Sequence, residues 1–164
     1  METAPIIRPA TSADAQALAD ILNHSIEHTN AIWLSEPVDA AERTQWMAQR
    51  RVLVAELAGE VAGFAGIGQW KGSCGYRYTA EDSIYIRDGF HGRGIASALF
   101  GALIEAAPAQ GYRVIVANIE AGNAASIALH EKFGFTKVGL MPGVGFKNDT
   151  FLDLAVYQLT LPVD

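Results

Sequence analysis

Two hydrophobic periods alternate along the chain and predict its elements. Four segments repeat apolar residues at every third or fourth position, as helices with one buried face do: 12–28, 39–50, 94–107 and 123–133. Seven shorter runs alternate or are rich in β-branched residues, as strands are: 6–8, 52–57, 61–70, 79–86, 114–117, 136–141 and 151–159. The resulting order, β-α-α-β-β-β-α-β-α-β-β, predicts a mixed α/β (α+β) protein with helices on the faces of one sheet.

Two connections stand out between these elements. Thr29–Pro37 is an apolar but irregular loop, which either packs on the core or lines a pocket. Pro142–Asp149 is the expected connection between the last two strands. Because no repeat or interdomain linker interrupts the pattern, residues 1–164 are expected to form a single domain.

Composition and charge argue against several classes of protein. Half of the 164 residues are hydrophobic, enough to bury a sizeable core. The net charge of −6 and the lack of any Lys/Arg run argue against a general nucleic-acid-binding protein. Cys74 is the only cysteine, so no internal disulfide can form. The first residues do not resemble a signal peptide and no apolar run has the length of a membrane span, so we expect a cytoplasmic protein.

The stretch Asp82–Leu103 carries the clearest chemical signal. A β-rich run leads into the glycine-rich loop 87–94, and a helical pattern follows. A helix that begins after glycines presents free backbone N–H groups and the positive end of its dipole, which suits a phosphate. Arg87 and Arg93 add local positive charge. The loop is therefore predicted to bind a phosphorylated cofactor.

Elimination narrows the choice of cofactor. Gly89 and Gly94 have the spacing of a P-loop, but Ile95-Ala96 stand where Lys-Ser/Thr must be. Gly92-Arg93-Gly94 opens like a dinucleotide fingerprint, but the third glycine is missing and the loop lies far from the first βα unit. An ordinary glycine-rich helix start remains the alternative to a binding loop.

A third interpretation rests on a resemblance. His91-Gly92-Arg93-Gly94-Ile95-Ala96 resembles the Arg/Gln-x-x-Gly-x-Gly/Ala loop of the GNAT N-acetyltransferases, which bind acetyl-CoA; His91 stands where Arg or Gln is usual. Asn123–Phe135 is similar to a second segment of these enzymes, Asn-x-x-Ser/Ala followed by (Tyr/His)-Glu-x-x-Gly-Phe. The resemblance implies a GNAT fold, with a mixed central sheet of about seven strands flanked by about four helices.

Further segments resemble one subfamily, the phosphinothricin / methionine sulfone (methionine sulfoximine) N-acetyltransferases: 31–33 with 37–39, 75–79, 119–126, and 144–147 with 152–154. This resemblance implies acetylation of the α-amino group of small amino-acid analogues, by direct transfer in a ternary complex within a homodimer. Two departures put the exact substrate in doubt. The connection after Gln49-Arg50-Arg51 is short, and Asn148-Asp149-Thr150-Phe151 replaces the usual Phe-Gly-Arg-Trp.

Glu81 is the candidate catalytic base. Acetyl transfer needs an amine with a free lone pair, so a base must remove a proton, directly or through a water. Glu81 matches the base position of the subfamily's Tyr-Thr-x-Glu segment. Asp82 points to the other side of a regular strand and is the weaker candidate. The alternative is that Glu81 is a solvated carboxylate at a strand end.

The resemblance also implies the residues that bind acetyl-CoA. Backbone N–H groups of Tyr85, Ile86 and Arg87 are expected to hold the acetyl carbonyl and the pantetheine amides. The remaining cofactor-binding positions are His91, Gly92, Arg93, Gly94, Ile95, Ala96, Asn123 and Ser126. His130, near the thioester sulfur, either protonates the departing thiolate or is a helix-surface residue satisfied by solvent.

The carboxylate of the acceptor needs a fork of donors. Arg77, flanked by Tyr76 and Tyr78, is the predicted clamp, and Trp33 and Lys147 are lesser candidates for the pocket wall. No metal site is predicted. His24 and His28 lie four apart on one helix, but nothing nearby completes a set of ligands.

Two other functions stay open. One is a GNAT acetyltransferase for another amine, such as a polyamine, a peptide N-terminus or an aminoglycoside. The other is an acetyl-CoA-binding sensor that has lost catalysis. The presence of both Glu81 and His130 favours an enzyme over a sensor.

Overall fold

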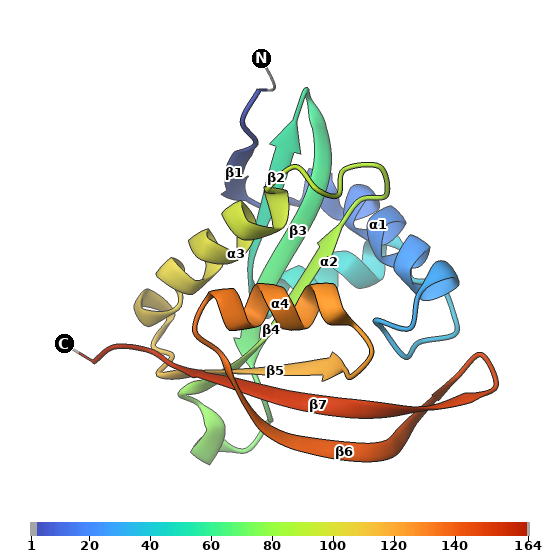
Figure 1. Cartoon of the computed structure of the whole chain (residues 1–164). Helices are drawn as coiled ribbons and strands as arrows, with labels where there is room; N and C mark the ends of the chain where they lie inside the picture. Colours follow the sequence, from blue (N-terminus) through green and yellow to red (C-terminus); the bar gives the residue numbers. More distant parts are fainter. Residues whose placement is uncertain (1–2, 164) are drawn as a thin grey trace.

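The computed structural model describes residues 3–163, and within them the elements follow the predicted order (Figure 1). The helices are α1 (Ala15–His28), α2 (Ala40–Ala48), α3 (Ile95–Ala106) and α4 (Ala124–Lys132). The strands are β1 (Ile6–Pro9), β2 (Arg51–Leu57), β3 (Glu60–Gln69), β4 (Thr79–Ile86), β5 (Val114–Glu120), β6 (Thr136–Lys147) and β7 (Thr150–Thr160). Short 3-10 turns are η1 (Ser12–Asp14), η2 (Cys74–Tyr76) and η3 (Pro108–Gln110). The predicted mixed fold of seven strands and four helices is confirmed.

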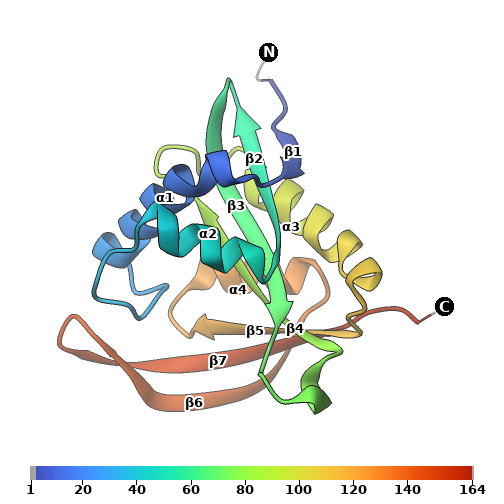
Figure 2. The same ribbon diagram turned by 180° about the vertical axis from the view of Figure 1, so that it is seen from behind.

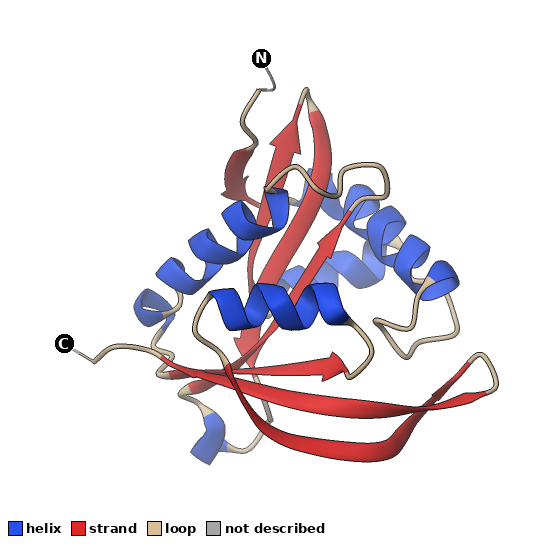
Figure 3. Ribbon diagram, viewed as in Figure 1, coloured by secondary structure: helices blue, strands red, loops and turns tan. Residues whose placement is uncertain are grey.

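All seven strands form one sheet, in the order β1-β2-β3-β4-β5-β7-β6 (Figure 3). Every neighbouring pair is antiparallel except β4 and β5. These two parallel strands pair only where Thr79–Glu81 meets Val114–Val116. Beyond Glu81 they spread apart, as Figure 1 shows. The sheet is therefore open on one side of β4, which leaves room for a ligand between the two strands.

Helices cover both faces of the sheet. α3 and α4 lie on one face in Figure 1, and α1 and α2 lie on the other, seen from behind in Figure 2. Phe100 and Leu103 of α3 are fully buried in the larger core. Leu18 and Leu22 of α1 pack against Phe64 of β3 in the smaller one. The alternation of β-strand side chains supplies both cores, because successive residues point to opposite faces.

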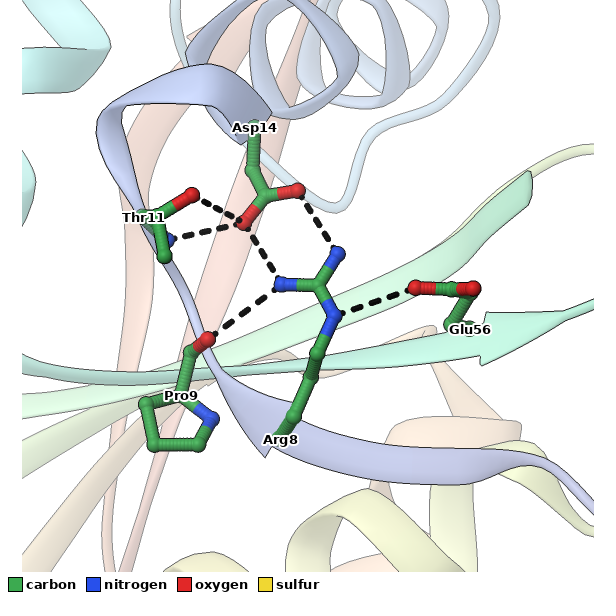
Figure 4. Close-up of polar contacts among 5 residues, drawn as sticks. All are labelled: Arg8, Pro9, Thr11, Asp14 and Glu56. Carbon is green, nitrogen blue, oxygen red and sulfur yellow. Dashed lines mark hydrogen bonds and ion pairs between the residues drawn. The ribbon is translucent and has the colours of Figure 1, made fainter. Parts of the chain in front are cut away.

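A polar cluster ties the start of α1 to the sheet (Figure 4). The Arg8 guanidinium donates to both carboxylate oxygens of Asp14 at 2.9 Å and to Glu56 of β2 at 3.0 Å. Asp14 also accepts from the Thr11 backbone N–H at 2.8 Å. Its bonds with Arg8 hold the pKa of Asp14 below its ordinary value, although burial acts in the opposite direction. The cluster fixes the direction of α1, which leads into the loop 29–37.

The prediction of an eight-residue connection between the last two strands is wrong. β6 runs on to Lys147, and only Asn148 and Asp149 connect it to β7, with φ angles of 51° and 56°. Two residues with positive φ are typical of a tight hairpin turn. A register shift between Met141 and Gly145 absorbs Pro142 within β6. Because β6 is an edge strand, a proline can lie at this irregularity without breaking the ladder.

Candidate active site

The open edge of β4 presents backbone amides beside the divergence from β5. The Arg87 amide donates to the Ala62 carbonyl at 2.8 Å, so it belongs to the ladder with β3. Antiparallel residues alternate between the two edges, which turns the Tyr85 amide to β3 and the Ile84 and Ile86 amides to the open edge. Of the three amides expected to hold the cofactor, that of Ile86 faces the open edge. The prediction for the Arg87 amide is wrong because this amide is bonded to Ala62, and alternation turns the Tyr85 amide to β3 as well.

Three cavities meet at this edge. The gap cavity, of about 200 Å³, lies where β4 and β5 diverge; its lining includes Glu81, Asp82, Tyr85, Asn118, Asn123, Ser126 and His130. The aromatic cavity, of about 570 Å³, is lined by Leu22, Ile32, Trp33, Leu34, Arg43, Trp46, Arg50, Glu81, Ser83 and Tyr85. The α1–α4 cleft, of about 620 Å³, includes His24, His28, His91, Asn123 and Ser126 in its lining. The gap cavity shares lining residues with each of the other two, so the three cavities adjoin along β4.

Glu81 lies where the aromatic cavity meets the gap cavity. Its side chain is 31% exposed, and its contacts are long: 3.7 Å to the Arg50 guanidinium and 3.5 Å to the Asn118 amide. Burial raises the pKa of Glu81 above its ordinary value, although the positive charge of Arg50 acts in the opposite direction. A carboxylate with a raised pKa and weak internal contacts is available to take a proton from an incoming group.

Asp82 and His130 form a buried pair on the other side of β4. Each side chain is only 3% exposed, and His130 Nε2 lies 2.8 Å from Asp82 Oδ2. His130 Nδ1 lies 2.7 Å from the Ser126 carbonyl, which can only accept, so Nδ1 carries a proton. Burial lowers the pKa of His130, but the hydrogen bond and charge of Asp82 and the Ser126 carbonyl raise it more, and the net pKa is above the ordinary value.

This pair settles one alternative of the sequence analysis. His130 is not a surface residue satisfied by solvent, because it is 2% exposed and packs edge-on against Phe100 and Phe135. Asp82 does point away from Glu81, as alternation predicts. Its second oxygen, Oδ1, is buried without a hydrogen-bond partner among the described residues, and Asp82 is one of the residues that line the gap cavity. A buried polar atom without a partner keeps unused capacity to accept a hydrogen bond.

The glycine-rich loop has the geometry of an anion site. Gly89, Gly92 and Gly94 adopt positive φ angles of 83°, 76° and 74°, and nothing lies within 4 Å of a Cβ built on any of them. Gly94 directly precedes α3. The predicted side chains of this segment do not all face the same space. His91 lines the α1–α4 cleft, whereas the Ile95 side chain is buried in the core, so only the backbone of Ile95 can contact a ligand. Open backbone before a helix N-terminus is suited to bind an anion such as a phosphate.

Of the remaining predicted cofactor-binding residues, Asn123 and Ser126 line the cavities, whereas Arg93 and Ala96 do not. The Arg93 guanidinium lies over the Phe90 ring at 5.3 Å, and Ala96 occupies the first turn of α3. Asn123 and Ser126 line both the gap cavity and the cleft. The Asn123 side chain accepts from the Ser126 backbone N–H at 3.2 Å, which makes it the N-cap of α4. These two residues are therefore fixed beside the gap.

The structure brings one of the predicted acceptor residues to Glu81 and leaves the others outside. Trp33 lines the aromatic cavity. Lys147 lies against the loop 29–37, where Nζ donates to two carbonyls instead of lining the cavity. Arg77 donates to the Cys74 carbonyl at 3.0 Å and lies over the Tyr78 ring at 4.5 Å, on an exposed segment. Arg77, Tyr76 and Tyr78 are absent from the lining of all three cavities within this chain.

Sequence reasoning missed the residues that α2 and its end contribute. Arg43 and Trp46 of α2, with Arg50 just after it, line the aromatic cavity. Both guanidinium groups lie over the Trp46 ring, at 4.7 and 5.2 Å. Arg43 is bound at 2.6 and 2.7 Å by Glu42, whereas the Arg50 contact with Glu81 is longer. The spacing i, i+3, i+7 is the signal that could have predicted this shared face.

Two features are absent from residues 3–163. No group of three or more His, Cys, Asp or Glu side chains is placed to hold a metal ion. No described helix is both long and apolar enough to cross a membrane.

Comparisons with known proteins agree on one family. Residues 17–135 match the model of the family described as the acetyltransferase (GNAT) family. The L-methionine sulfoximine/L-methionine sulfone acetyltransferase of Pseudomonas aeruginosa is 47% identical over 94% of this chain and 94% of its own. The phosphinothricin N-acetyltransferase of Streptomyces viridochromogenes is 36% identical, over 93% and 85% of the two chains. A Salmonella typhimurium acetyltransferase solved with its cofactor acetyl-CoA superimposes with a TM-score of 0.94, at 42% identity, over 98% and 95%.

Proposed function

The chain belongs to the acetyltransferase (GNAT) family, and we propose that it transfers the acetyl group of acetyl-CoA to the α-amino group of a small amino-acid analogue. Methionine sulfoximine, methionine sulfone and phosphinothricin, the substrates named for its relatives, are the candidate acceptors. The observation that carries this proposal is the position of Glu81, in the lining of both the aromatic cavity and the gap cavity. An amine and a thioester that enter from opposite sides would meet beside this one carboxylate.

Glu81 prepares the acceptor for attack. The acceptor arrives as an ammonium ion without a lone pair, and Glu81 takes one proton from it, directly or through a water. The raised pKa of Glu81 makes it a stronger base than an exposed carboxylate would be. The freed amine then attacks the acetyl carbonyl in the gap cavity; as the C–N bond forms and the C–S bond breaks, the nitrogen loses its second proton to water and the thiolate of CoA departs.

The open edge of β4 and the glycine-rich loop hold the cofactor. The amides of Ile84 and Ile86 face the gap, where they can donate to the acetyl carbonyl and to the pantetheine amides. The open backbone around Gly92 and Gly94 suits the pyrophosphate, and Asn123 and Ser126 line the route of the CoA arm. Acetyl-CoA supplies the acetyl group as a thioester, and every contact proposed for it comes from this chain.

The Asp82–His130 pair returns a proton to the leaving thiolate. Both nitrogens of His130 already have protein partners, so the proton reaches the sulfur through Asp82. In this step the Asp82 carboxylate receives the proton of His130 Nε2, and the carboxyl group so formed passes that proton to the thiolate and becomes a carboxylate again. The imidazolium becomes neutral imidazole, and the thiolate becomes the thiol of CoA.

Two arginines compete for the role of carboxylate clamp. Arg77 remains the prediction of the resemblance, and Arg50 is a second candidate because it lines the aromatic cavity with Glu81. Steady-state kinetics of Arg77→Ala and Arg50→Gln distinguish them. The variant of the true clamp raises the acceptor KM at least tenfold and leaves the acetyl-CoA KM within twofold, since one charged hydrogen bond is lost. If a variant raises the acceptor KM and the acetyl-CoA KM equally, the arginine that it replaces is not the clamp.

Thiol release from acetyl-CoA tests the proposed reaction. The acceptor panel contains methionine sulfoximine, methionine sulfone, phosphinothricin, ordinary amino acids, spermidine and an aminoglycoside. We expect turnover with the first three and a loss of turnover in Glu81→Gln with acetyl-CoA affinity retained. Turnover with only spermidine or the aminoglycoside would replace the acceptor class. Binding of acetyl-CoA without any turnover would leave a sensor.

The edge hairpin supports the proposal of a homodimer. β6 and β7 expose several large apolar side chains, those of Val138, Leu140, Met141, Val144, Phe146 and Phe151. Phe151 is 73% exposed and packs on Phe146, with ring centroids 5.0 Å apart. A second copy of the chain would cover these side chains. Analytical ultracentrifugation of the protein and of Phe151→Asp tests the dimer; a monomeric parent protein would contradict it. We assign the enzyme to the cytoplasm, which suits the exposed free thiol of Cys74.

A further inference from the structure

The tip of the β6–β7 hairpin, residues 145–150, is joined to the wall of the aromatic cavity. The wall is the loop 29–37, here called the acceptor loop, whose Ile32, Trp33 and Leu34 line that cavity. The two segments are more than a hundred positions apart in the chain. Asn148 Nδ2 donates to the Asn30 side chain at 3.0 Å, and two closer contacts come from Gly145 and Lys147.

Gly145 determines how near the indole of Trp33 approaches the hairpin. A Cβ built on Gly145 would lie 2.6, 2.7 and 2.7 Å from three atoms of the Trp33 ring, distances that real side chains do not reach. The ring is also held from the other side, because Nε1 donates to the Asn30 carbonyl at 3.1 Å. Any side chain at position 145 must therefore displace the indole and change the cavity wall.

Lys147 holds the main chain of the same loop. Nζ donates to the Thr29 carbonyl at 2.8 Å and to the Ile32 carbonyl at 2.7 Å. These bonds span the turn at which the acceptor loop leaves α1. Gly145 and Lys147 are two apart in β6 and face the loop together, whereas Phe146 between them is 58% exposed on the opposite side.

We propose that the tip of the β6–β7 hairpin determines acceptor specificity, with Gly145 setting the position of Trp33 and Lys147 setting the main chain of the acceptor loop. Both are positioning residues, since they act through the cavity wall and do not touch the acceptor. The inference rests on the proposed function in taking the aromatic cavity as the acceptor site. It assigns to this hairpin a part in substrate choice, and three of the four residues that depart from the subfamily, 148–150, lie at the same tip.

Gly145→Ala against Gly139→Ala tests the first contact. Both glycines lie in β6, but nothing is within 4 Å of a Cβ built on Gly139. We expect Gly145→Ala to change the acceptor KM, and the ratio of kcat/KM between methionine sulfone and phosphinothricin, by about 10- to 200-fold, the range of one misplaced methylene-sized contact. The acetyl-CoA KM should stay within twofold. Equal effects of the two substitutions would overturn the proposal.

Lys147→Met against Lys137→Met tests the second contact. Both lysines lie in β6, and the Lys137 side chain is exposed and outside the acceptor loop. Lys147→Met leaves two carbonyls without their donor, and we expect the acceptor KM to rise about tenfold. Lys147→Arg, which can still donate to both carbonyls, should recover most of the loss. A matching rise in the acetyl-CoA KM, or no recovery with arginine, would overturn the assignment.

A readout without turnover separates this inference from the proposed function. Protein labelled with 5-fluorotryptophan has three ¹⁹F signals, from Trp33, Trp46 and Trp70, and Trp33→Phe assigns the first. We expect Gly145→Ala to move the Trp33 signal and Gly139→Ala to leave all three in place. If the signal moves while no amino-acid acceptor is turned over, the proposed function fails and the structural link stands. An unmoved Trp33 signal refutes the link itself.

Discussion

Glu81 and Asp82 are neighbours in β4, yet the structure treats their carboxylates in opposite ways. Glu81 is 31% exposed, with its nearest polar contacts at 3.5 and 3.7 Å. Asp82 is 3% exposed and lies 2.8 Å from His130. Strand alternation sends the two side chains to different sides of the sheet, and the divergence from β5 exposes both to the gap cavity. One carboxylate is loosely held beside an open cavity, and the other is enclosed.

The difference separates two requirements of acetyl transfer. A base that meets a new substrate in each cycle has to be reachable, and strong internal bonds would compete with that substrate. A group that keeps a proton ready for a leaving thiolate benefits from enclosure, since solvent cannot exchange with it freely. Enclosure has a consequence for the fold, because a buried charge that loses its partner is costly. We therefore expect changes at position 81 to affect turnover and changes at position 82 to affect stability as well.

The largest effect is expected for Glu81→Gln. The amide keeps the size and the polar contacts of the side chain but cannot take a proton, so turnover should fall about 10²- to 10⁴-fold. Acetyl-CoA affinity, measured by calorimetry, should remain close to that of the parent protein, and the urea unfolding midpoint should not fall. A turnover within threefold of the parent value would show that Glu81 is not the base.

Asp82→Ala should cost the most stability. The substitution leaves His130 buried without its counter-charge, which destabilises a fold by about 3–5 kcal/mol. The matched change Glu81→Ala removes a partly exposed carboxylate with long contacts, and we expect less than about 1 kcal/mol. Urea unfolding of the two variants at pH 7 measures the difference. Similar losses at both positions would mean that the enclosure of Asp82 has no energetic consequence.

The contributions of His130 and Glu81 to the free energy of unfolding should both decrease as pH rises, but over different pH ranges. The pKa of His130 is raised in the folded state, so its contribution is complete below the ordinary value of 6.5 and is lost as pH rises through the folded pKa. The unfolding free energy of the parent protein should therefore exceed that of His130→Gln most at acidic pH. The gap between the two should narrow at alkaline pH.

The contribution of Glu81 to stability should change at lower pH than that of His130 in the same experiment. Its pKa is also raised in the folded state, so its favourable contribution belongs to pH values below the ordinary 4.5 and declines above it. Relative to the parent, Glu81→Gln should gain stability between pH 4 and neutrality. If the difference in unfolding free energy between the parent protein and His130→Gln increased with pH, the pKa of His130 would not be raised by its pairing with Asp82.

The two sides also differ in how much of them the sequence could predict. The ranges of β4, the glycine-rich loop and α3 follow from local signals, alternation and glycines, and the structure matches them within a residue or two. Glu81 was predicted from the resemblance of its Tyr-Thr-x-Glu segment together with the position of this strand. The pairing of Asp82 with His130 joins residues 48 apart and depends on the divergence of β4 from β5, which no local pattern encodes.

The β6–β7 hairpin is a second case in which local sequence signals did not predict the structure. Pro142 and Gly143 predict a turn from their own chemistry, and the structure places them inside β6 because pairing with β7 tolerates an irregularity there. The actual turn, Asn148-Asp149, has residues suited to positive φ, but the stronger signal six positions earlier concealed it. Tertiary pairing decided between two local candidates. The role of Lys147 was hidden for the same reason, since its partners lie in the acceptor loop.

The smallest effect is expected from Arg50→Met, which tests how strongly Arg50 interacts with the Glu81 carboxylate. The Arg50 guanidinium lowers the pKa of Glu81 against the effect of burial, so its removal should move the acidic limb of the kcat/KM profile to higher pH. Because the two groups are 3.7 Å apart and partly exposed, the interaction is worth about 1 kcal/mol at most, or about a fivefold loss of kcat/KM on that limb. The shift should shrink in high salt, which screens such a pair, while Lys137→Met, which removes the same charge from an exposed strand position, should leave the profile in place. A limb that does not move, or one that moves equally in the lysine variant, would mean that Arg50 acts on the acceptor and not on the base.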